Sequence, residues 1–474
     1  MPLALFLARE RLIAGAAGFP LDDSWIHLHF ARNIAEGHGF SYNPGVPVAG
    51  STAPLWTLLL AMVSALAGAS AATVKVTGVL TTIAAAIVTR RAAVAWQASR
   101  SVALAAAVAL VWTGPMVWGA LSGMEVSLAA LLVAGVLWAH AAARWLLVAV
   151  LAGLAGLARP EALLLVPLLL LSRPLSLVQR VSFVVTVAVL LTPAVVFSIV
   201  TVGAPLPATA AAKIEGGVLG WFAGVREPLG TTFVGRPSQY VHAWLRWLWA
   251  THWLLPLAIA AGVVGAWLRR GRALGVLTLA LVLHPVAMAV LAPYRDPAFQ
   301  EARYSLHLLP VGVVAAAVAL GSLDGRGRQI LGVCYLVAAL GFLPAAAERY
   351  AWGVQNINAM QVHLGRWVAA RLPPSARIAV NDVGAIAFFS RREIIDLMGL
   401  VTPAIIPYRR EGEHGVIRYI TETCPDYVIV FPNWFPELTG RSTLLAPIYR
   451  VRLDRNEVSG GPEMVVYRLT RCTV

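Results

Sequence analysis

Long apolar runs restrict the possible folds of this chain more than any other feature of its sequence. They recur between residues 72 and 346, with short polar loops between them. A helix needs roughly 20 apolar residues to cross the hydrocarbon of a bilayer, and several runs approach that length. The chain is therefore predicted to be a polytopic α-helical membrane protein, with spans near 72–89, 101–118, 126–143, 145–158, 162–172, 181–202, 253–268, 274–292, 304–321 and 329–346.

The charge content supports this class. Only 13% of the residues are charged and 59% are hydrophobic, whereas soluble globular domains carry roughly 25% charge. The net charge of +14 could indicate nucleic acid as a partner. Much of the excess, however, is arginine in the loops between apolar runs, as the positive-inside rule predicts. Since the sequence also carries no nucleic-acid-binding motif, nucleic acid is excluded as a partner.

The arginine-bearing loops predict a topology. If every run from residue 72 onward crosses once, the loops richest in arginine share one side, the cytoplasmic side of a bacterial inner membrane. The other loops then face outward. The apolar run at 54–68 cannot cross, because every later loop would change sides, so we expect an interfacial or re-entrant helix there. Residues 1–18 are too short and too charged to span, and they resemble the end of a truncated first helix.

The composition changes after residue 346. Short β-branched and aromatic runs such as "DYVIVFPN" and "EMVVYRL" are bounded by Pro, Gly, Asn and Asp, as strands are. We therefore expect a transmembrane domain at 1–349, whose first extracytoplasmic loop is 20–71, and a small extracytoplasmic α/β domain at 350–474. Cys424 and Cys472 can pair if that domain lies outside the cell, whereas Cys334 is expected in a core.

A polar stretch interrupts the apolar pattern at 21–56 and begins with two adjacent carboxylates. Asp22 and Asp23 cannot point the same way on a regular helix, so one can face a cavity while the other caps the helix that follows. Ionisable groups at a membrane boundary are costly unless they have a role. His27, Arg32 and Asn33 fall on or near one face of that helix.

Further charged residues lie in the other outer loops. Glu125 either compensates a helix N-terminus or faces the same cavity as Asp22. Arg159 either pairs with Glu161 or binds an anion. Lys213 either reaches toward lipid headgroups or binds a phosphate.

Arg303 and Tyr304 begin another predicted helix on the same outer side. Together these basic and acidic groups favour an anionic, lipid-linked substrate. A transporter would instead place charged residues within its spans, whose middles are almost free of charge here.

The stretch "PLDDSWIHLHFARNIAEGHGFSYNPGVPVAGSTAPLWTLLLA" resembles the first extracytoplasmic loop of bacterial GT-C membrane glycosyltransferases, nearest to their arabinofuranosyltransferase-like and mannosyltransferase-like branch. The blocks "SGMEV", "LARPEA", "PLPATAAAK", "EARY" and "VNDVGAIAFFSRREIIDLMGL" follow in the family's order, so the resemblance covers most of the chain. It implies a GT-C-like bundle of about 10–11 helices.

The resemblance also implies an activity. The protein would be an inverting hexosyl- or pentosyltransferase that moves a sugar from a polyprenyl-phosphate donor to a cell-envelope glycan, lipid or protein acceptor, in contact with membrane lipids. A transporter or flippase for lipid-linked glycans, and a non-catalytic assembly protein, remain the alternatives. No metal ligand set is predicted, although a divalent cation stays open because members of the family differ.

Site roles follow from the same resemblance. Asp22 is implied as the general base, with Asp23 second, and Glu125 as a group that assists the base or orients the acceptor. The remaining implied residues would bind substrate, and the three cations Arg159, Lys213 and Arg303 would stabilise the leaving phosphate; the full set is His27, Arg32, Asn33, Asn43, Arg159, Lys213, Arg303 and Tyr304.

Two positions depart from the family's pattern. Ala208 stands where members often have Asn, and Ser24 where a small apolar residue is common. In the α/β domain, Asp382 and Asp396 are expected in turns, and the domain is expected to help bind an acceptor glycan.

Overall fold

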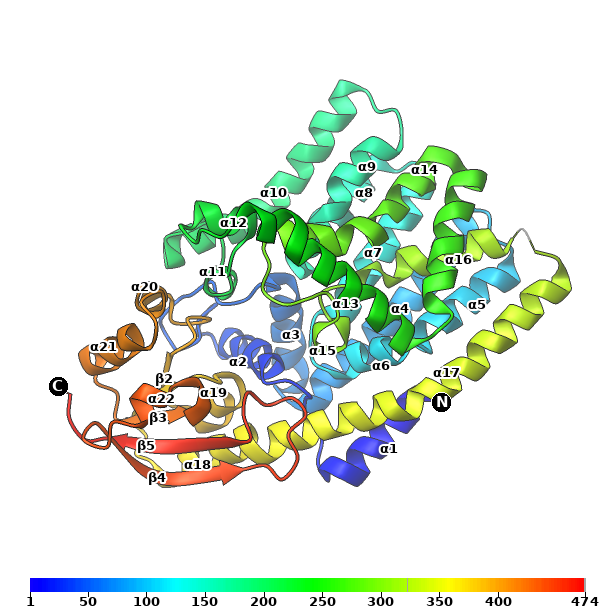
Figure 1. The fold of residues 1–474 in the computed structure, drawn as a ribbon. Coiled ribbons are helices and arrows are strands. Elements are labelled where there is room, and N and C mark those ends of the chain that lie inside the picture. Colours follow the sequence, from blue (N-terminus) through cyan, green and yellow to red (C-terminus); the bar gives the residue numbers. More distant parts are fainter. Residues whose placement is uncertain (322, 473–474) are drawn as a thin grey trace. The chain divides into compact units, whose positions relative to one another are not determined.

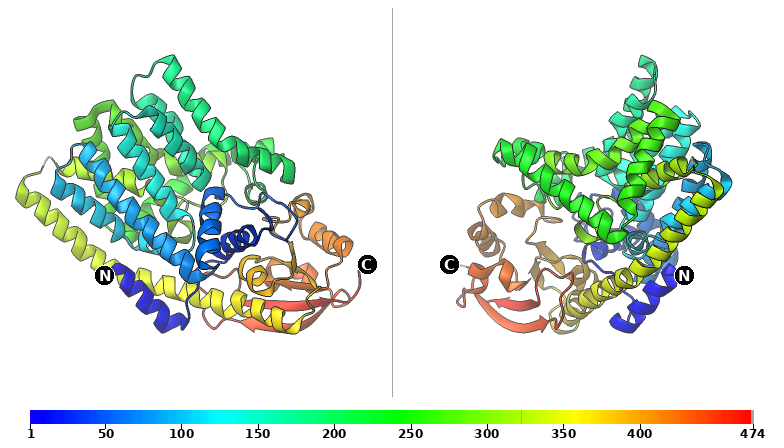
Figure 2. Two further views of the ribbon diagram at one scale, coloured as in Figure 1. Left: turned by 180° about the vertical axis from the view of Figure 1, so that it is seen from behind. Right: turned by 45° about the vertical axis from the view of Figure 1, so that its right-hand side comes forward.

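The computed structural model describes residues 1–321 and 323–472. It forms two compact units built from interleaved segments of the chain (Figures 1 and 2). Unit 1 comprises Met1–Leu5, Val76–Pro193 and Lys213–Ala347. Unit 2 comprises Phe6–Lys75, Ala194–Ala212 and the chain from Glu348 onward. Four helices therefore begin in one unit and end in the other: α1 (Pro2–Ala14), α4 (Ala71–Ala95), α10 (Leu177–Val202) and α17 (Gly325–Ile357).

Unit 1 is helical throughout its described residues. In the hydrocarbon of a membrane, backbone N–H and C=O groups find no water to bond to. A helix satisfies these groups internally, so apolar segments of a membrane protein fold as helices. Its own helices are α5 (Arg100–Val111), α6 (Gly114–Leu121), α7 (Val126–Ala141), α8 (Trp145–Ala158), α9 (Leu165–Ser172), α12 (Gly217–Phe222), α13 (Arg236–Thr251), α14 (Leu255–Leu291), α15 (Phe299–Ala302) and α16 (Leu309–Leu320).

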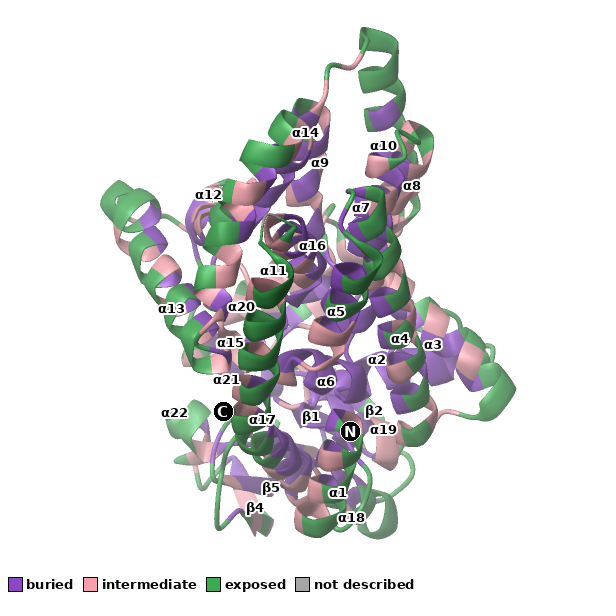
Figure 3. Ribbon diagram, turned by 90° about the vertical axis from the view of Figure 1, so that its right-hand side faces the viewer, coloured by how far each residue is buried: buried purple, intermediate pink, exposed green. Residues whose placement is uncertain are grey.

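The chain is a multi-pass α-helical membrane protein, as predicted. Five described helices are long and apolar enough to cross a membrane, or six if α5 and α6, bent by 60° at their junction, form one span. Four shorter apolar helices accompany them: Pro54–Ala67, Val126–Ala141, Trp145–Ala158 and Pro160–Ser172. The predicted runs 253–268 and 274–292 both lie in α14, which breaks at Gly271, where φ is 55°. Exposed apolar side chains cover most of α10, as expected for a surface that faces lipid (Figure 3).

Unit 2 contains one five-stranded sheet, in the order β2-β1-β3-β5-β4. β1 lies parallel to β2 and β3, while β5 is antiparallel to β3 and β4. The strands are β1 (Arg377–Val380), β2 (Glu393–Asp396), β3 (Tyr427–Val430), β4 (Leu445–Arg452) and β5 (Glu463–Leu469). The helices of this unit are α2 (Asp23–Ala35), α3 (Pro54–Ala67), α11 (Ala208–Ala212), α18 (His363–Arg371), α19 (Gly384–Ser390), α20 (Ile406–Arg409), α21 (Glu413–Thr423) and α22 (Pro436–Thr439). The predicted α/β character is confirmed.

Two hydrophobic cores cover the two faces of this sheet. One core holds α21 and α22. The other holds α18 and α19 together with residues of the first loop, among them Phe30, Tyr42 and Val48. The expected boundary between 349 and 350 lies close to the point where α17 passes from unit 1 into unit 2. The loop at 20–71, however, shares its core with the C-terminal sheet, because its apolar side chains bury themselves there.

A buried ion pair connects distant segments within unit 2. The Lys75 ammonium donates to the Glu10 carboxylate, which also accepts bonds from the Tyr350 hydroxyl at 3.2 Å and from the Gly18 N–H at 3.1 Å. Both charged residues are buried, so these bonds replace the water that each group loses on folding.

The cysteines follow one expectation and contradict another. Cys424 and Cys472 form a disulfide, with their Cα atoms 5.4 Å apart. Cys334 was expected in a core but is exposed on α17. The reason is that an apolar surface of a membrane helix can face lipid, so an apolar run does not imply burial within the protein.

Candidate active site

Asp22 lies immediately before α2, but its side chain makes no cap to that helix. Its carboxylate instead binds the start of α19. Oδ2 accepts the Gly384 N–H at 2.6 Å and Oδ1 accepts the Ala385 N–H at 2.8 Å. The first N–H groups of a helix have no partner within the helix, so a carboxylate satisfies them well. Asp22 is 9% exposed, and both of its oxygens are engaged in bonds to the backbone.

Asp23 and Asp382 lie close enough to Asp22 to interact with its charge. Burial and the Asp382 carboxylate raise the pKa of Asp22 well above its ordinary value, Asp23 raises it further, and the two backbone bonds lower it. Burial raises the pKa of Asp382 to about 6, although a bond of 2.7 Å from the Gln361 amide opposes the rise. The charges of Asp22, Asp23 and Asp382 therefore interact, which favours the protonated form of the buried acids Asp22 and Asp382.

The polar residues that follow on α2 hold the first loop in place. Arg32 donates to the Phe388 carbonyl at 2.7 Å and lies over the Phe388 ring. Asn33 donates to the Ser41 and Tyr42 carbonyls at 2.9 and 2.8 Å. The role of Arg32 and Asn33 as substrate ligands stays a prediction, and the contacts described here are those of scaffolding residues.

Asn43 has a similar position at the edge of the sheet. Its Nδ2 donates to the Ile394 carbonyl at 2.8 Å, and its Oδ1 accepts the Ile394 N–H at 2.9 Å. The side chain thus bonds to β2 as a neighbouring strand would. Its predicted contact with substrate is likewise untested, but both ends of its amide are already bonded to the backbone of β2.

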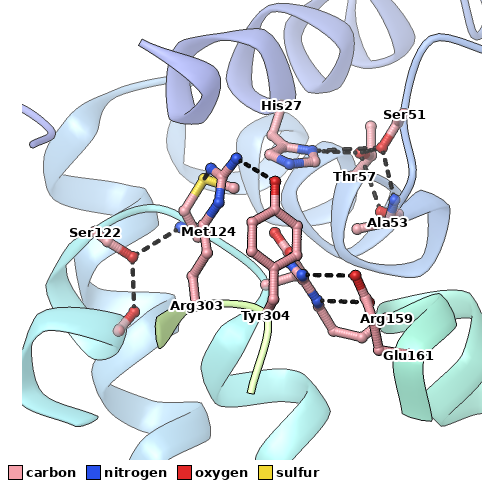
Figure 4. Close-up of polar contacts among 12 residues, drawn as sticks. His27, Ser51, Ala53, Thr57, Ser122, Met124, Arg159, Glu161, Arg303 and Tyr304 are labelled. Atoms are coloured by element: carbon pink, nitrogen blue, oxygen red, sulfur yellow. Dashed lines mark hydrogen bonds and ion pairs between the residues drawn. The ribbon is translucent and has the colours of Figure 1, made fainter. Parts of the chain in front are cut away.

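The two histidines of α2 point to separate partners. His27 lies 3.1 Å from the Thr57 hydroxyl through Nδ1, and Thr57 lies 3.1 Å from the Ser51 hydroxyl (Figure 4). His29 lies 2.8 Å from the Tyr42 carbonyl through Nε2. Burial, together with the charge of Arg32, lowers the pKa of His29 to about 3, so its ring is neutral. Among residues 1–321 and 323–472, no group of three or more His, Cys, Asp or Glu side chains is arranged to hold a metal ion.

The predicted residues of unit 1 form a buried group around Arg159. The break after α8 places this arginine in extended backbone just before Pro160. Its guanidinium pairs with Glu125, and it binds Glu161 through Nε and one terminal nitrogen, each at 3.2 Å (Figure 4). The pairing of Arg159 with Glu161, one of the two interpretations offered for that arginine, is therefore observed, and Glu125 is a second carboxylate that compensates the same guanidinium.

Arg303 and Tyr304 lie beside this network. The Tyr304 ring lies under both guanidinium groups, 4.6 Å from that of Arg159 and 4.9 Å from that of Arg303. Arg303 also donates to the Tyr304 hydroxyl at 2.9 Å (Figure 4). Arg303 is 3% exposed, so its charge lies in a site with little water. The structure thus brings Glu125, Arg159, Arg303 and Tyr304 together, and their predicted roles in catalysis and substrate binding stay predictions.

Lys213 belongs to a second cationic group of unit 1. Its ammonium lies 5.2 Å from the centre of the Tyr294 ring, and the Arg295 guanidinium lies 4.7 Å from the same centre. The two cations thus lie against one aromatic ring, where cation–π attraction contributes to holding them.

Sequence reasoning missed the functional context of Asp382, Gln361 and Gly384. Asp382 was expected to be a turn residue, and it does follow β1 directly. The missed point is that residues after β1 meet the acidic pair from more than 350 positions earlier in the chain. The block "NDVGA" carried the signal, because a parallel strand followed by a glycine at a helix start is a frequent ligand-binding position.

Comparisons with known proteins bear on the fold. A family model described as a domain of unknown function, DUF8728, matches residues 355–467. No curated protein matches. The structure of ArnT from Cupriavidus metallidurans bound to undecaprenyl phosphate is similar with a TM-score of 0.61 at 15% identity, over 98% of this chain and 97% of that one. The apo oligosaccharyltransferase of Archaeoglobus fulgidus is similar with a TM-score of 0.55 at 12% identity, over 90% of this chain and 69% of that one.

Both of these enzymes belong to the GT-C superfamily. The similarity to ArnT extends over the helical bundle, the first loop and the C-terminal sheet, since it covers nearly the whole of both chains. The bundle of apolar helices with a small α/β unit is therefore similar in fold to these two enzymes.

Proposed function

We propose that this protein is a glycosyltransferase that transfers a sugar from a polyprenyl-phosphate donor to a cell-envelope acceptor on the outer face of the bacterial inner membrane. The observation that carries the proposal is the acidic pair Asp22–Asp23, next to Asp382, at the start of the first-loop helix of a GT-C fold. The similar ArnT structure contains undecaprenyl phosphate, which supports a lipid-phosphate donor for this chain too.

The chemistry needs a base and a site for the leaving phosphate. A hydroxyl of the acceptor attacks the anomeric carbon, and a carboxylate of the acidic pair takes the hydroxyl proton. The bond between that carbon and the phosphate oxygen breaks, and its electron pair leaves with the polyprenyl phosphate. Because attack and departure occur on opposite faces of the sugar, the anomeric configuration inverts.

The leaving phosphate gains negative charge, which fixed cations stabilise best where water is scarce. Arg303 is the first candidate because it is buried and its guanidinium stacks on Tyr304. Lys213 is the second, held on Tyr294. Arg159 is already compensated by Glu125 and Glu161, so we assign it the role of orienting this group.

The test is transfer by the purified protein from a panel of polyprenyl-phosphate sugars, read as glycosidic product and as released polyprenyl phosphate. Arg303→Gln and Lys213→Gln are each expected to lower kcat by roughly 10²–10³-fold. Arg144→Gln is the matched control. Arg144 lies in the loop after α7, is exposed, and stacks on Trp138 of that helix.

Two results would contradict the proposal. Movement of lipid-linked sugar across vesicles without a new glycosidic bond would identify a transporter. Full transfer activity in Arg303→Gln would exclude its role at the phosphate.

A further inference from the structure

The two neighbouring carboxylates, Asp22 and Asp23, have different surroundings. Both oxygens of Asp22 accept backbone N–H groups of α19, at 2.6 and 2.8 Å. Asp23 is the first residue of α2 and is half-buried, whereas the other residues from 18 to 33 are buried. Consecutive residues of a helix differ in direction by about 100°. A carboxylate fixed at position 22 therefore also fixes the direction of the one at position 23.

The place that Asp22 occupies is defined by the local backbone. β1 ends at Val380, and the chain turns through Asn381–Val383 into α19. In parallel α/β units, ligands bind at this junction between the end of a strand and the start of the next helix. Here the protein's own Asp22 takes that position. Gly384 makes the approach possible, since a Cβ there would lie closest to the backbone carbonyl oxygen of Asp22 and 2.8 Å from its Oδ2.

Other contacts hold α2 and the loop that follows it against α19 and the turn before it. The Tyr42 hydroxyl donates to the Val383 carbonyl at 2.7 Å, and Arg32 donates to the Phe388 carbonyl at 2.7 Å. The Trp25 ring lies 5.2 and 4.9 Å from the rings of Phe388 and Phe389. Helix α2 thus contacts α19 at Trp25 and Arg32, and Asp22 adds a contact at the N-terminal end of α2, next to Asp23.

We propose that Asp22 is a positioning residue, which holds α2 against α19, and that Asp23 is the general base. Asp23 is half-buried, whereas both carboxylate oxygens of Asp22 are bound to backbone donors of α19. This proposal rests on the transferase function above for the role of Asp23, but the binding of Asp22 to α19 is independent of that function.

The experiment compares Asp22→Asn, Gly384→Ala and Asp23→Asn in the full-length purified protein. Asp22→Asn replaces one acceptor with an N–H₂ group that opposes a backbone donor. Gly384→Ala places a methyl group against the backbone carbonyl and the carboxylate of Asp22, so it pushes the start of α2 away from α19 and leaves all three acids unchanged in identity. If Asp22 positions α2, these two variants share one phenotype: hydrogen exchange in the peptide 384–390 accelerates, the Tm falls, and kcat drops by roughly 10²-fold, the cost of a displacement of about 1 Å, at unchanged KM.

Asp23→Asn is expected to behave differently. Exchange at 384–390 and the Tm stay at the values of the unmodified protein, while kcat falls by up to about 10⁴-fold, the range for loss of a general base. Gly332→Ala is the control for the glycine substitution, since a Cβ at 332 meets no atom within 4 Å.

The outcomes separate the two proposals. Unchanged exchange at 384–390 in both Asp22→Asn and Gly384→Ala would overturn the positioning role, whether or not transfer is detected. Near-normal transfer by Asp23→Asn, with a complete loss in Asp22→Asn at an unchanged Tm, would return the base to Asp22. Absence of transfer by the unmodified protein from every donor would refute the proposed function, yet the exchange result would still decide the role of Asp22.

Discussion

At the scale of single residues, Lys75 and Glu10 form the most completely enclosed ion pair of unit 2. Lys75 is 6% exposed and Glu10 3%. Removal of one partner leaves the other charge buried without compensation, which costs far more than the pair contributes. Lys75→Met is therefore expected to lower the free energy of unfolding by about 3–5 kcal/mol.

The double variant Glu10→Gln/Lys75→Met distinguishes charge from packing. It removes both charges and keeps an acceptor for Tyr350, so it should be clearly more stable than Lys75→Met alone. The measurement is thermal or denaturant unfolding in detergent. A double variant as unstable as the single one would show that the loss comes from packing of the lysine stem.

Asp382 gives unit 2 a dependence on pH. Its pKa rises from an ordinary value of 3.8 to about 6, because of burial first and then because of Asp23 and Asp396. The folded state therefore binds the proton more tightly than the unfolded state. The contribution of Asp382 to stability is complete below pH about 4 and is lost as the pH rises through about 6.

Asp382→Asn is neutral at every pH and still offers an oxygen to Gln361. Its stability should match that of the unmodified protein near pH 4 and exceed it above pH 6, by up to about 3 kcal/mol. Tm values measured between pH 4 and 8 check this, with the exposed Asp454→Asn as the control. If the Tm of Asp382→Asn differed from that of the unmodified protein by the same amount at every pH in that range, the raised pKa of Asp382 would be contradicted.

At the scale of elements, the close contact of α4 with α6 depends on a glycine. A Cβ at Gly78 would lie 3.1 Å from the carbonyl carbon of Ala120 and closer still to its oxygen. Small residues permit such approaches between membrane helices. Gly78→Ala should therefore destabilise the protein by about 1–3 kcal/mol, as overpacking does.

The control for this prediction is Gly341→Ala on α17, where a Cβ meets no atom within 4 Å. It should be neutral or slightly stabilising, because alanine favours the helix. Thermal unfolding of both variants in one detergent gives the comparison. Equal Tm values for the two would mean that α4 and α6 can move apart without cost.

The elements themselves were largely predictable from the sequence, because the period and length of apolar runs determine where helices form. The small sheet was also predictable, since β-branched runs such as "YVIV" lie between turn residues. The break of α14 at Gly271 and the pairing of Asn43 with β2 were not, because each depends on one backbone conformation or one contact that is distant in sequence.

Part of the candidate site was predictable from the sequence and part was not. The polar residues could be identified because charge is rare in this chain, and Glu125, Arg159, Arg303 and Tyr304 do gather in one group. The surroundings of Asp22 could not be read, because its partners Gly384 and Ala385 contribute only backbone N–H groups. Because every residue except proline has a backbone N–H, the sequence does not indicate which of these groups bind a carboxylate.

At the scale of the whole molecule, the disulfide reports the compartment of the α/β domain. Cys424 and Cys472 are paired, and Cys334 is exposed with a free thiol. Disulfides persist in oxidising compartments. If that domain lies outside the cytoplasm, freshly prepared and denatured protein should react with one maleimide before reduction and with three afterwards, as read by gel shift.

Loss of the bridge should also cost stability. The disulfide joins two cysteines that are 48 residues apart in the sequence, and it restricts the unfolded chain. The double variant Cys424→Ser/Cys472→Ser is therefore expected to lower the free energy of unfolding by about 2–4 kcal/mol. Cys334→Ser is the control and should leave the Tm unchanged. Three reactive thiols before reduction would place the domain in a reducing compartment and contradict the proposed sidedness.

Both edges of the sheet are closed to further strands. At one edge, the Asn43 side chain occupies the N–H and the carbonyl of Ile394 on β2. At the other, β4 carries Pro447, which has no N–H to donate, next to a shift in register. A strand from a second copy would therefore lose hydrogen bonds at either edge, which disfavours polymerisation of the protein through its sheet.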